Sequence, residues 1–247
     1  MKRQSAAKLR RIAGKNVQAA VRLRLRQVFV LSNYVLKYSR DHRVKYISHL
    51  DFIKMFHRAV RRAGLLMEFS QGFNPHPIMT VAMPLSVGVT ADAELCKIGF
   101  AMDYTPEEIK NRLNDNLPGG YVIEKVAKTE GKQHDFAKLD RAVYDVELES
   151  SGSFDADAFL ANRELVVMKK TKSGEKEADI RAYIYDFSVT EQNDGKMKIT
   201  MCLAAGNLYN LKPDTVIAAM EKYTDGFSVE FFCVHRRKLL AGKKELI

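Results

Sequence analysis

The sequence predicts an α+β protein made of tandem ferredoxin-like (split βαβ) repeats with mainly antiparallel sheets. From residue 34 onward, strand-like and helix-like hydrophobic periods alternate, and the second half of the chain repeats the order of the first, as an internal duplication would. Pro106 and Pro213 each stand in the first turn of a predicted helix. Gly120 and Gly226 each precede the last predicted strand of a half.

The predicted elements of each half follow the order β-α-β-β-α-β with one additional strand. In the first half, strands are predicted near 34–39, 65–69, 77–83, 93–101 and 120–127, and helices over 49–63 and 106–116. In the second half, strands are predicted near 142–149, 164–169, 179–189, 196–204 and 227–234, and helices over 155–162 and 213–223. Asn193-Asp194-Gly195 is a strong hairpin signal.

This pattern divides the chain into four parts. We expect a disordered basic N-terminal extension, a first ferredoxin-like unit, a polar linker and a second ferredoxin-like unit, at residues 1–32, 33–128, 129–141 and 142–247. No apolar run approaches the roughly 18 residues of a membrane span, so a cytoplasmic protein without membrane contact is expected. The three cysteines form no C-x-x-C pair and are predicted to be small core residues rather than disulfide or metal ligands.

The net charge of +10 is concentrated in two segments. Residues 1–30 hold nine Lys and Arg and no acid, and residues 37–62 hold eight against two acids, so the rest of the chain is net acidic. The first segment is typical of an RNA-binding arm, a transit peptide or a solvated extension. The second lies inside a predicted folded element and is therefore more informative.

That second segment includes the helix predicted to begin near residue 49. Ser48 is its predicted N-cap, and Asp51 at the third helical position completes an arrangement like a capping box. Four apolar residues recur at helical spacing and are predicted to face the core: Leu50, Ile53, Phe56 and Val60. The opposite face carries cations with little compensating acid, which suits either phosphate contacts or simple solvation. We predict nucleic-acid contacts for Lys54, Arg58, Arg61 and Arg62.

A stiff turn is predicted over residues 70–77, Ser-Gln-Gly-Phe-Asn-Pro-His-Pro. Gly72 permits a positive φ, while Pro75 and Pro77 fix two φ angles. The turn would present side chains that can stack on a base or read its edge. The predicted contact residues are Gln71, Phe73, Asn74 and His76. The second half has no counterpart of this turn or of the basic helix, so the fold alone does not require them.

His49 and His76 leave a catalytic alternative open. If the helix start and the turn approached each other, paired histidines could cleave RNA without metal, one acting as base and the other as acid. Together with Asp51 they could instead bind a metal. Nothing in the sequence brings these residues together, so no catalytic residue, metal ligand or cofactor is assigned.

Residues 46–64, the 70–77 turn and Met-Pro-Leu-Ser-Val-Gly-Val at 83–89 together resemble the bacterial radical SAM-linked protein family. That family is a domain of unknown function encoded beside a radical SAM enzyme or fused to its C-terminus. The resemblance extends over about 34–240 and implies a bacterial cytoplasmic protein that assists a radical SAM partner, with RNA as the implied substrate. The chain lacks a C-x-x-x-C-x-x-C run, so it is not itself the radical SAM enzyme.

These observations favour a non-catalytic RNA-binding accessory protein that presents substrate to a radical SAM partner enzyme. Two alternatives stay open. One is a metal-independent ribonuclease that uses His49 and His76. The other is a protein–protein adaptor, without RNA, whose basic helix meets an acidic partner surface.

Overall fold

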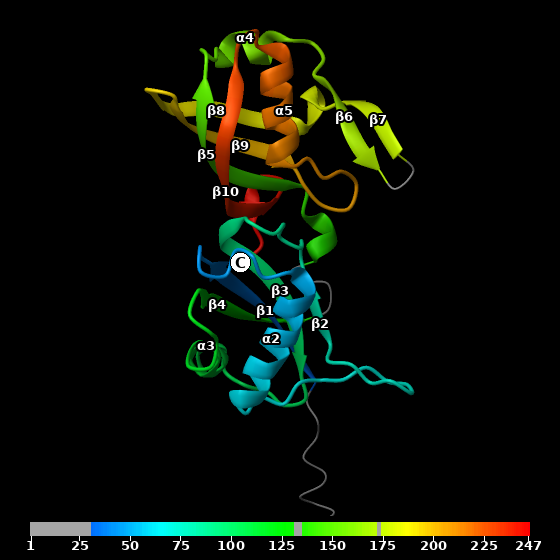
Figure 1. The fold of residues 1–247 in the computed structure, drawn as a ribbon. Helices are drawn as coiled ribbons and strands as arrows, with labels where there is room; N and C mark the ends of the chain where they lie inside the picture. Colours follow the sequence, from blue (N-terminus) through cyan, green and yellow to red (C-terminus); the bar gives the residue numbers. More distant parts are fainter. Residues whose placement is uncertain (1–30, 131–134, 172–173) are drawn as a thin grey trace, which may run out of the picture.

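The computed structural model describes residues 31–130, 135–171 and 174–247. In this part of the chain the fold is mixed α+β, with one large, mainly antiparallel sheet and few helices (Figure 1). The α+β prediction is therefore confirmed at this level. The predicted N-terminal extension up to residue 30, and residues 131–134 of the predicted linker, lie outside the described residues.

The first half of the fold places two helices on one face of its strands. The strands are β1 (Ser32–Arg40), β2 (Met79–Val81), β3 (Thr90–Phe100) and β4 (Tyr121–Thr129), in the order β4-β1-β3-β2. The helices are α2 (His49–Arg62) and α3 (Pro106–Asn114). Alternate residues of β1, such as Tyr34 and Leu36, share a core with Phe56 of α2 and Ile109 of α3. Both helices therefore cover the same side of the sheet.

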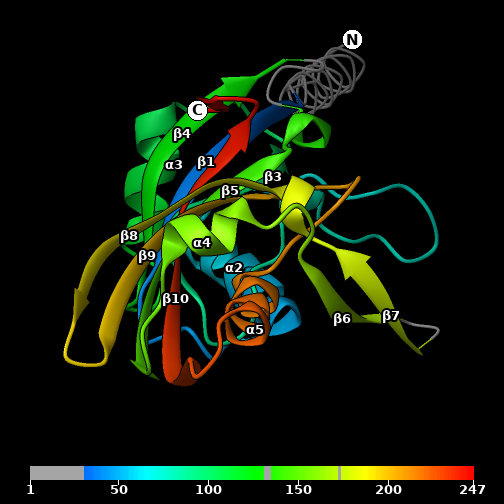
Figure 2. The ribbon, with the colours of Figure 1, turned by 90° about the horizontal axis from the view of Figure 1, so that it is seen from above.

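The second half has a similar arrangement. Its strands β5 (Arg141–Ser151), β8 (Ile184–Asn193), β9 (Lys196–Ala204) and β10 (Ser228–Ala241) stand in the order β10-β5-β9-β8. Its helices are α4 (Ala156–Ala161) and α5 (Pro213–Tyr223). A separate hairpin, β6 (Val166–Thr171) with β7 (Gly174–Asp179), projects on the side away from the β8–β9 turn (Figures 1 and 2). The short β11 (Lys244–Glu245) folds back on β10.

The two halves meet where β3 runs parallel to β10. Thr90 pairs with His235 and Ala91 with Arg236, which joins the strands into a nine-stranded sheet. Arg236 is buried and donates from Nε to Oε1 of Glu94 at 2.7 Å. Burial by itself would lower the pKa of Arg236, but the adjacent Glu94 carboxylate raises it, so the guanidinium stays charged.

Several predicted elements need correction. Residues 65–69 form only isolated bridges, Met67 to Phe100 and Phe69 to Pro77, instead of a strand. The segment predicted as one strand over 179–189 is divided between β7 and β8 by a short 3₁₀ turn. The hairpin at 193–195 is confirmed, since Asp194 and Gly195 both have positive φ.

Two residue environments also differ from expectation. Leu50 is 68% exposed, because Phe52 begins the buried stripe of α2 and Leu50 lies about 200° from it around the helix. Cys96 is buried as expected, but Cys233 is exposed on β10. The core prediction for the cysteines is therefore wrong for Cys233.

Candidate nucleic-acid interface

Helix α2 is fixed to the sheet by aromatic packing and by a cap. Phe52 stacks on Tyr38 of β1 with ring centroids 5.1 Å apart, and Phe56 is fully buried beside them. Oγ of Ser48 accepts from the backbone N–H of Asp51 at 3.2 Å. The Ser48 hydroxyl also lies 2.8 Å from Oδ2 of Asp51, whereas a capping box would join that carboxylate to the Ser48 N–H. The helix is thus held with one face toward solvent.

That outward face carries the four predicted cations, all exposed. Lys54 lies 3.7 Å from Asp51, one helical turn away. Within the described part of the chain, no carboxylate is within ion-pair distance of Arg58, Arg61 or Arg62. Three guanidinium groups thus face solvent without an acidic partner, which favours a polyanionic ligand.

Two of these arginines line a shallow groove. Arg58 and Arg62 form one side of it with Met55, and residues 116–118 form the other side. Arg62 also donates from Nη2 to the carbonyl of Asn116, which holds its guanidinium at the rim. The groove encloses about 330 Å³ and could seat part of an extended chain against the helix.

His57 belongs to the same helix and was not among the predicted residues. Its partial burial lowers its pKa, and the nearby Arg61 lowers it further. Its Nε2 is buried and has no hydrogen-bond partner in the described part of the protein. At neutral pH the imidazole is therefore uncharged, and the charge of this face comes from Lys54 and the arginines. In the sequence, the signal that could have identified His57 was its position four residues before Arg61.

The 70–77 turn is closed by hydrogen bonds between its ends. The N–H of Ser70 donates to the carbonyl of His76 at 2.9 Å, and Oγ of Ser70 lies 2.8 Å from Nδ1 of His76. Gly72 has a φ of +127°, in the region that favours glycine. Phe73 is fully exposed, and Gln71 and Asn74 are exposed beside it. The turn thus presents all four predicted contact residues to solvent, and Nδ1 of His76 is engaged by the Ser70 hydroxyl.

His49 and His76 lie on segments that diverge. His49 is the first residue of α2, close to the junction of the two halves, whereas the 70–77 turn extends past β2 and away from the sheet (Figure 1). No contact joins the two side chains in the part of the chain that the structure describes. The residues that the structure describes contain no cluster of His, Cys, Asp or Glu suited to a metal ion.

Arg40 positions the segment that leads into α2, a role that the sequence did not suggest. It is 4% exposed at the end of β1, and its Nη2 donates to the carbonyls of Val44, Lys45 and Ile47 at 2.8, 3.2 and 3.1 Å. Because Arg40 is charged and lies in a basic segment, nothing in the sequence indicated that its side chain is buried. The guanidinium fixes the backbone immediately before the N-cap Ser48.

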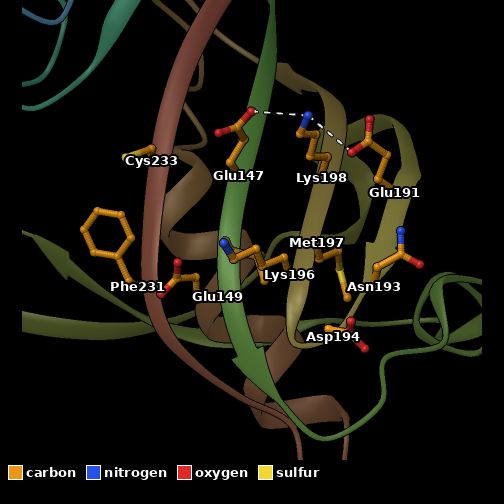
Figure 3. Close-up of a pocket in the computed structure, with 11 residues that line it drawn as sticks. Glu147, Glu149, Glu191, Asn193, Asp194, Lys196, Met197, Lys198, Phe231 and Cys233 are labelled. Carbon is orange, nitrogen blue, oxygen red and sulfur yellow. Dashed lines mark ion pairs between the residues drawn. The ribbon is translucent and has the colours of Figure 1, made fainter.

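A larger pocket lies elsewhere, on the open face of the second half (Figure 3). It encloses about 620 Å³ over β5, β8, β9 and β10. Its carboxylates outnumber its ammonium groups: Glu147, Glu149, Glu191 and Asp194 against Lys196 and Lys198. Lys198 lies 3.2 Å from Glu191 and 3.7 Å from Glu147, so part of this charge is already paired. An acidic surface repels phosphates, which leaves α2 as the stronger candidate.

The fold and the helix together define a mixed α+β protein with a candidate polyanion-binding face. The family model described as "uncharacterized protein conserved in bacteria" (DUF2344) matches residues 33–213, so the chain belongs to that family of bacterial domains of unknown function. None of the curated proteins matches the sequence. Among the described residues, none of the helices has the length and apolar character needed to span a membrane.

Two solved structures are similar over 83% of this chain. One is from the crystal structure of a Cbf5-Nop10-Gar1 complex, at 7% identity and a TM-score of 0.46, and this chain spans 48% of that chain. The other is an unknown protein from Galdieria sulphuraria, at 11% identity and a TM-score of 0.26, of which 98% is covered. Neither likeness bears on function.

Proposed function

We propose that this protein binds RNA through the exposed face of α2 and presents it to a partner enzyme. The observation that carries the proposal is the set of three exposed arginines, Arg58, Arg61 and Arg62, with no carboxylate partner in the described residues. Arginine forks match phosphate oxygens, and a rigid helix holds them at fixed spacing. Such contacts give affinity and salt dependence with little sequence preference.

The 70–77 turn would supply local recognition. A fully exposed phenylalanine at the tip of a closed, glycine- and proline-containing turn is suited to stacking on an unpaired base. Gln71 and Asn74 stand beside it with amide groups that can pair with base edges. The exposed aromatic ring would serve equally for a protein partner, and that possibility is the adaptor alternative.

The partner and the architecture are part of the same proposal. The accessory role toward a radical SAM enzyme in the bacterial cytoplasm is supported by the resemblance of residues 46–88. We also infer that the halves are tandem ferredoxin-like copies of one split βαβ unit. The orders β4-β1-β3-β2 and β10-β5-β9-β8 support this, because each places the first of its four strands between the third and the fourth of them in chain order.

A charge-reversal experiment tests RNA binding. Arg61→Glu with Arg62→Glu should weaken the affinity for single-stranded RNA at least tenfold, measured by fluorescence anisotropy, because two phosphate contacts become repulsive. The matched control is Arg163→Glu with Lys243→Glu, which makes the same charge change at exposed positions of the second half. Equal affinities for the two double variants would refute the proposal.

The same preparations test the two alternatives. Intact labelled RNA after incubation of wild type and His49→Ala in EDTA would dispose of the metal-independent ribonuclease. A complex with a radical SAM protein that survives nuclease treatment, together with no measurable RNA affinity, would favour the adaptor.

A further inference from the structure

A second groove lies where the two halves of the fold meet. It encloses about 450 Å³, within the range of about 300–1,000 Å³ usual for small-molecule sites. One wall is the segment 83–89, Met-Pro-Leu-Ser-Val-Gly-Val, of the first half. The opposite wall comes from β5, β10 and residues 210–214 of the second half. None of the lining residues belongs to α2, so this groove is separate from the proposed RNA-binding face.

The wall formed by 83–89 is fixed at both ends. Nη2 of Arg236 donates to the carbonyl of Met83 at 2.8 Å, while its Nε holds Glu94 of β3. The N–H of Gly88 donates to the carbonyl of Lys45 at 2.7 Å, with Gly88 at a φ of +89°. The groove is therefore formed before any ligand enters, which reduces the ordering cost of binding.

The lining combines an aromatic ring and apolar surface with a cation and a carboxylate at the edge. Phe232 of β10 is 36% exposed and Val87 on the facing wall is 56% exposed. Lys212 and Asp214 are both exposed among the lining residues of the second half, so the groove edge carries one cation and one carboxylate. A flat apolar group would pack between Phe232 and Val87, and an anionic group would lie near Lys212. A nucleotide has both parts in one molecule.

The groove is also within reach of the proposed RNA-binding face. The hydrogen bond between Gly88 and Lys45 joins its wall to the segment that leads into α2. From there α2 runs toward Arg62, away from the junction (Figure 1). An RNA strand held by the arginines could thus extend along the helix to the groove.

We propose that this junction groove binds one unpaired nucleotide of the RNA held by α2, with its base against Phe232 and its phosphate beside Lys212. This inference rests on the proposed function and adds a subsite to it. Holding one nucleotide apart from the strand is what presentation to an enzyme that modifies RNA requires.

Two neighbouring phenylalanines on β10 allow a matched test. Phe232 lines the junction groove, whereas Phe231 is 57% exposed and lines the acidic pocket on the opposite face of the same strand (Figure 3). The probe is a labelled, random-sequence, ten-nucleotide single-stranded RNA. Phe232→Ala should weaken its binding about fivefold or more, the usual effect of losing one stacked base, and Phe231→Ala should leave it unchanged. Thermal unfolding of each variant confirms that both are folded.

An abasic oligonucleotide of the same length identifies the group that enters the groove. Wild type and Phe232→Ala should bind it equally, because no base is left to stack. If Phe231→Ala and Phe232→Ala bind the random-sequence RNA alike while the arginine variants lose it, the groove proposal is wrong and RNA binding by α2 stands. If wild type binds neither RNA, both proposals are wrong.

Discussion

Arg40 shows how one buried cation can organise a segment of backbone. Its guanidinium reaches three carbonyl groups between β1 and α2 from a position that is 4% exposed. Charged donors form stronger hydrogen bonds than neutral ones, and carbonyls left without a donor in the interior carry a desolvation cost. The direction in which α2 leaves the sheet therefore depends on a residue that makes no contribution to its exposed face.

Replacing Arg40 with methionine should lower the free energy of unfolding by about 1–3 kcal/mol, because the carbonyls of three residues each lose a charged donor. The measurement is the urea midpoint. Arg43→Met is the control: Arg43 is exposed and pairs with Asp41 at 2.6 Å, an arrangement that contributes little to stability. Equal midpoints for the two variants would show that Arg40 does not hold this segment.

His57 should give the protein a measurable dependence of stability on pH. Burial and Arg61 keep its pKa in the folded protein below the ordinary value of 6.5, so the unfolded chain binds a proton more readily. Its contribution is fully present above pH 6.5 and is lost as the pH falls toward the lowered pKa. Urea midpoints above and below pH 6.5 should therefore differ more for wild type than for His57→Gln. Identical pH profiles would contradict this assignment.

At the scale of single elements, periodicity predicted most of what the structure contains. The first turns of α3 and α5 followed from the prolines at their N1 positions, and the basic face of α2 followed from its spacing of cations. The same periodicity correctly placed Phe56 and Val60 in the core but chose Leu50 over Phe52 at the start of the stripe. Both residues are apolar, and only the sheet beneath the helix decides which of them is covered.

The 70–77 turn could be predicted as a stiff, exposed element because glycine and proline restrict the backbone locally. Its position relative to His49 could not, since that depends on how α2 and β2 pack on the sheet. The candidate site was therefore predictable as two separate motifs, and their separation in space was not. The position of Arg40 beneath the segment before α2 was equally invisible to sequence patterns.

At the scale of the whole molecule, the joint between the halves is the feature that sequence reasoning missed. Thr90 and His235 are 145 residues apart, and their strands pair in parallel over only two register positions. So short a ladder leaves no local hydrophobic signal. The joint is completed by Arg236 and Glu94, an ion pair buried between the halves.

This buried pair should dominate the stability of the joint. Arg236→Met leaves the Glu94 carboxylate buried without its partner and should lower the free energy of unfolding by about 3–5 kcal/mol. The double variant Arg236→Met with Glu94→Leu removes both charges and should recover most of that loss. Urea unfolding of the three proteins decides the matter. A double variant as unstable as Arg236→Met would mean that packing, and not the unpaired charge, causes the loss.

The central claim is that the exposed arginines of α2 contact phosphates. Its most direct test is the salt dependence of RNA affinity for wild type and for Arg58→Glu with Arg61→Glu and Arg62→Glu. Each phosphate contact with a single strand contributes about 0.7 to the slope of log affinity against log salt, so losing three should reduce the slope by about 2. An unchanged slope in the triple variant would contradict the claim and place any RNA contact elsewhere on the molecule.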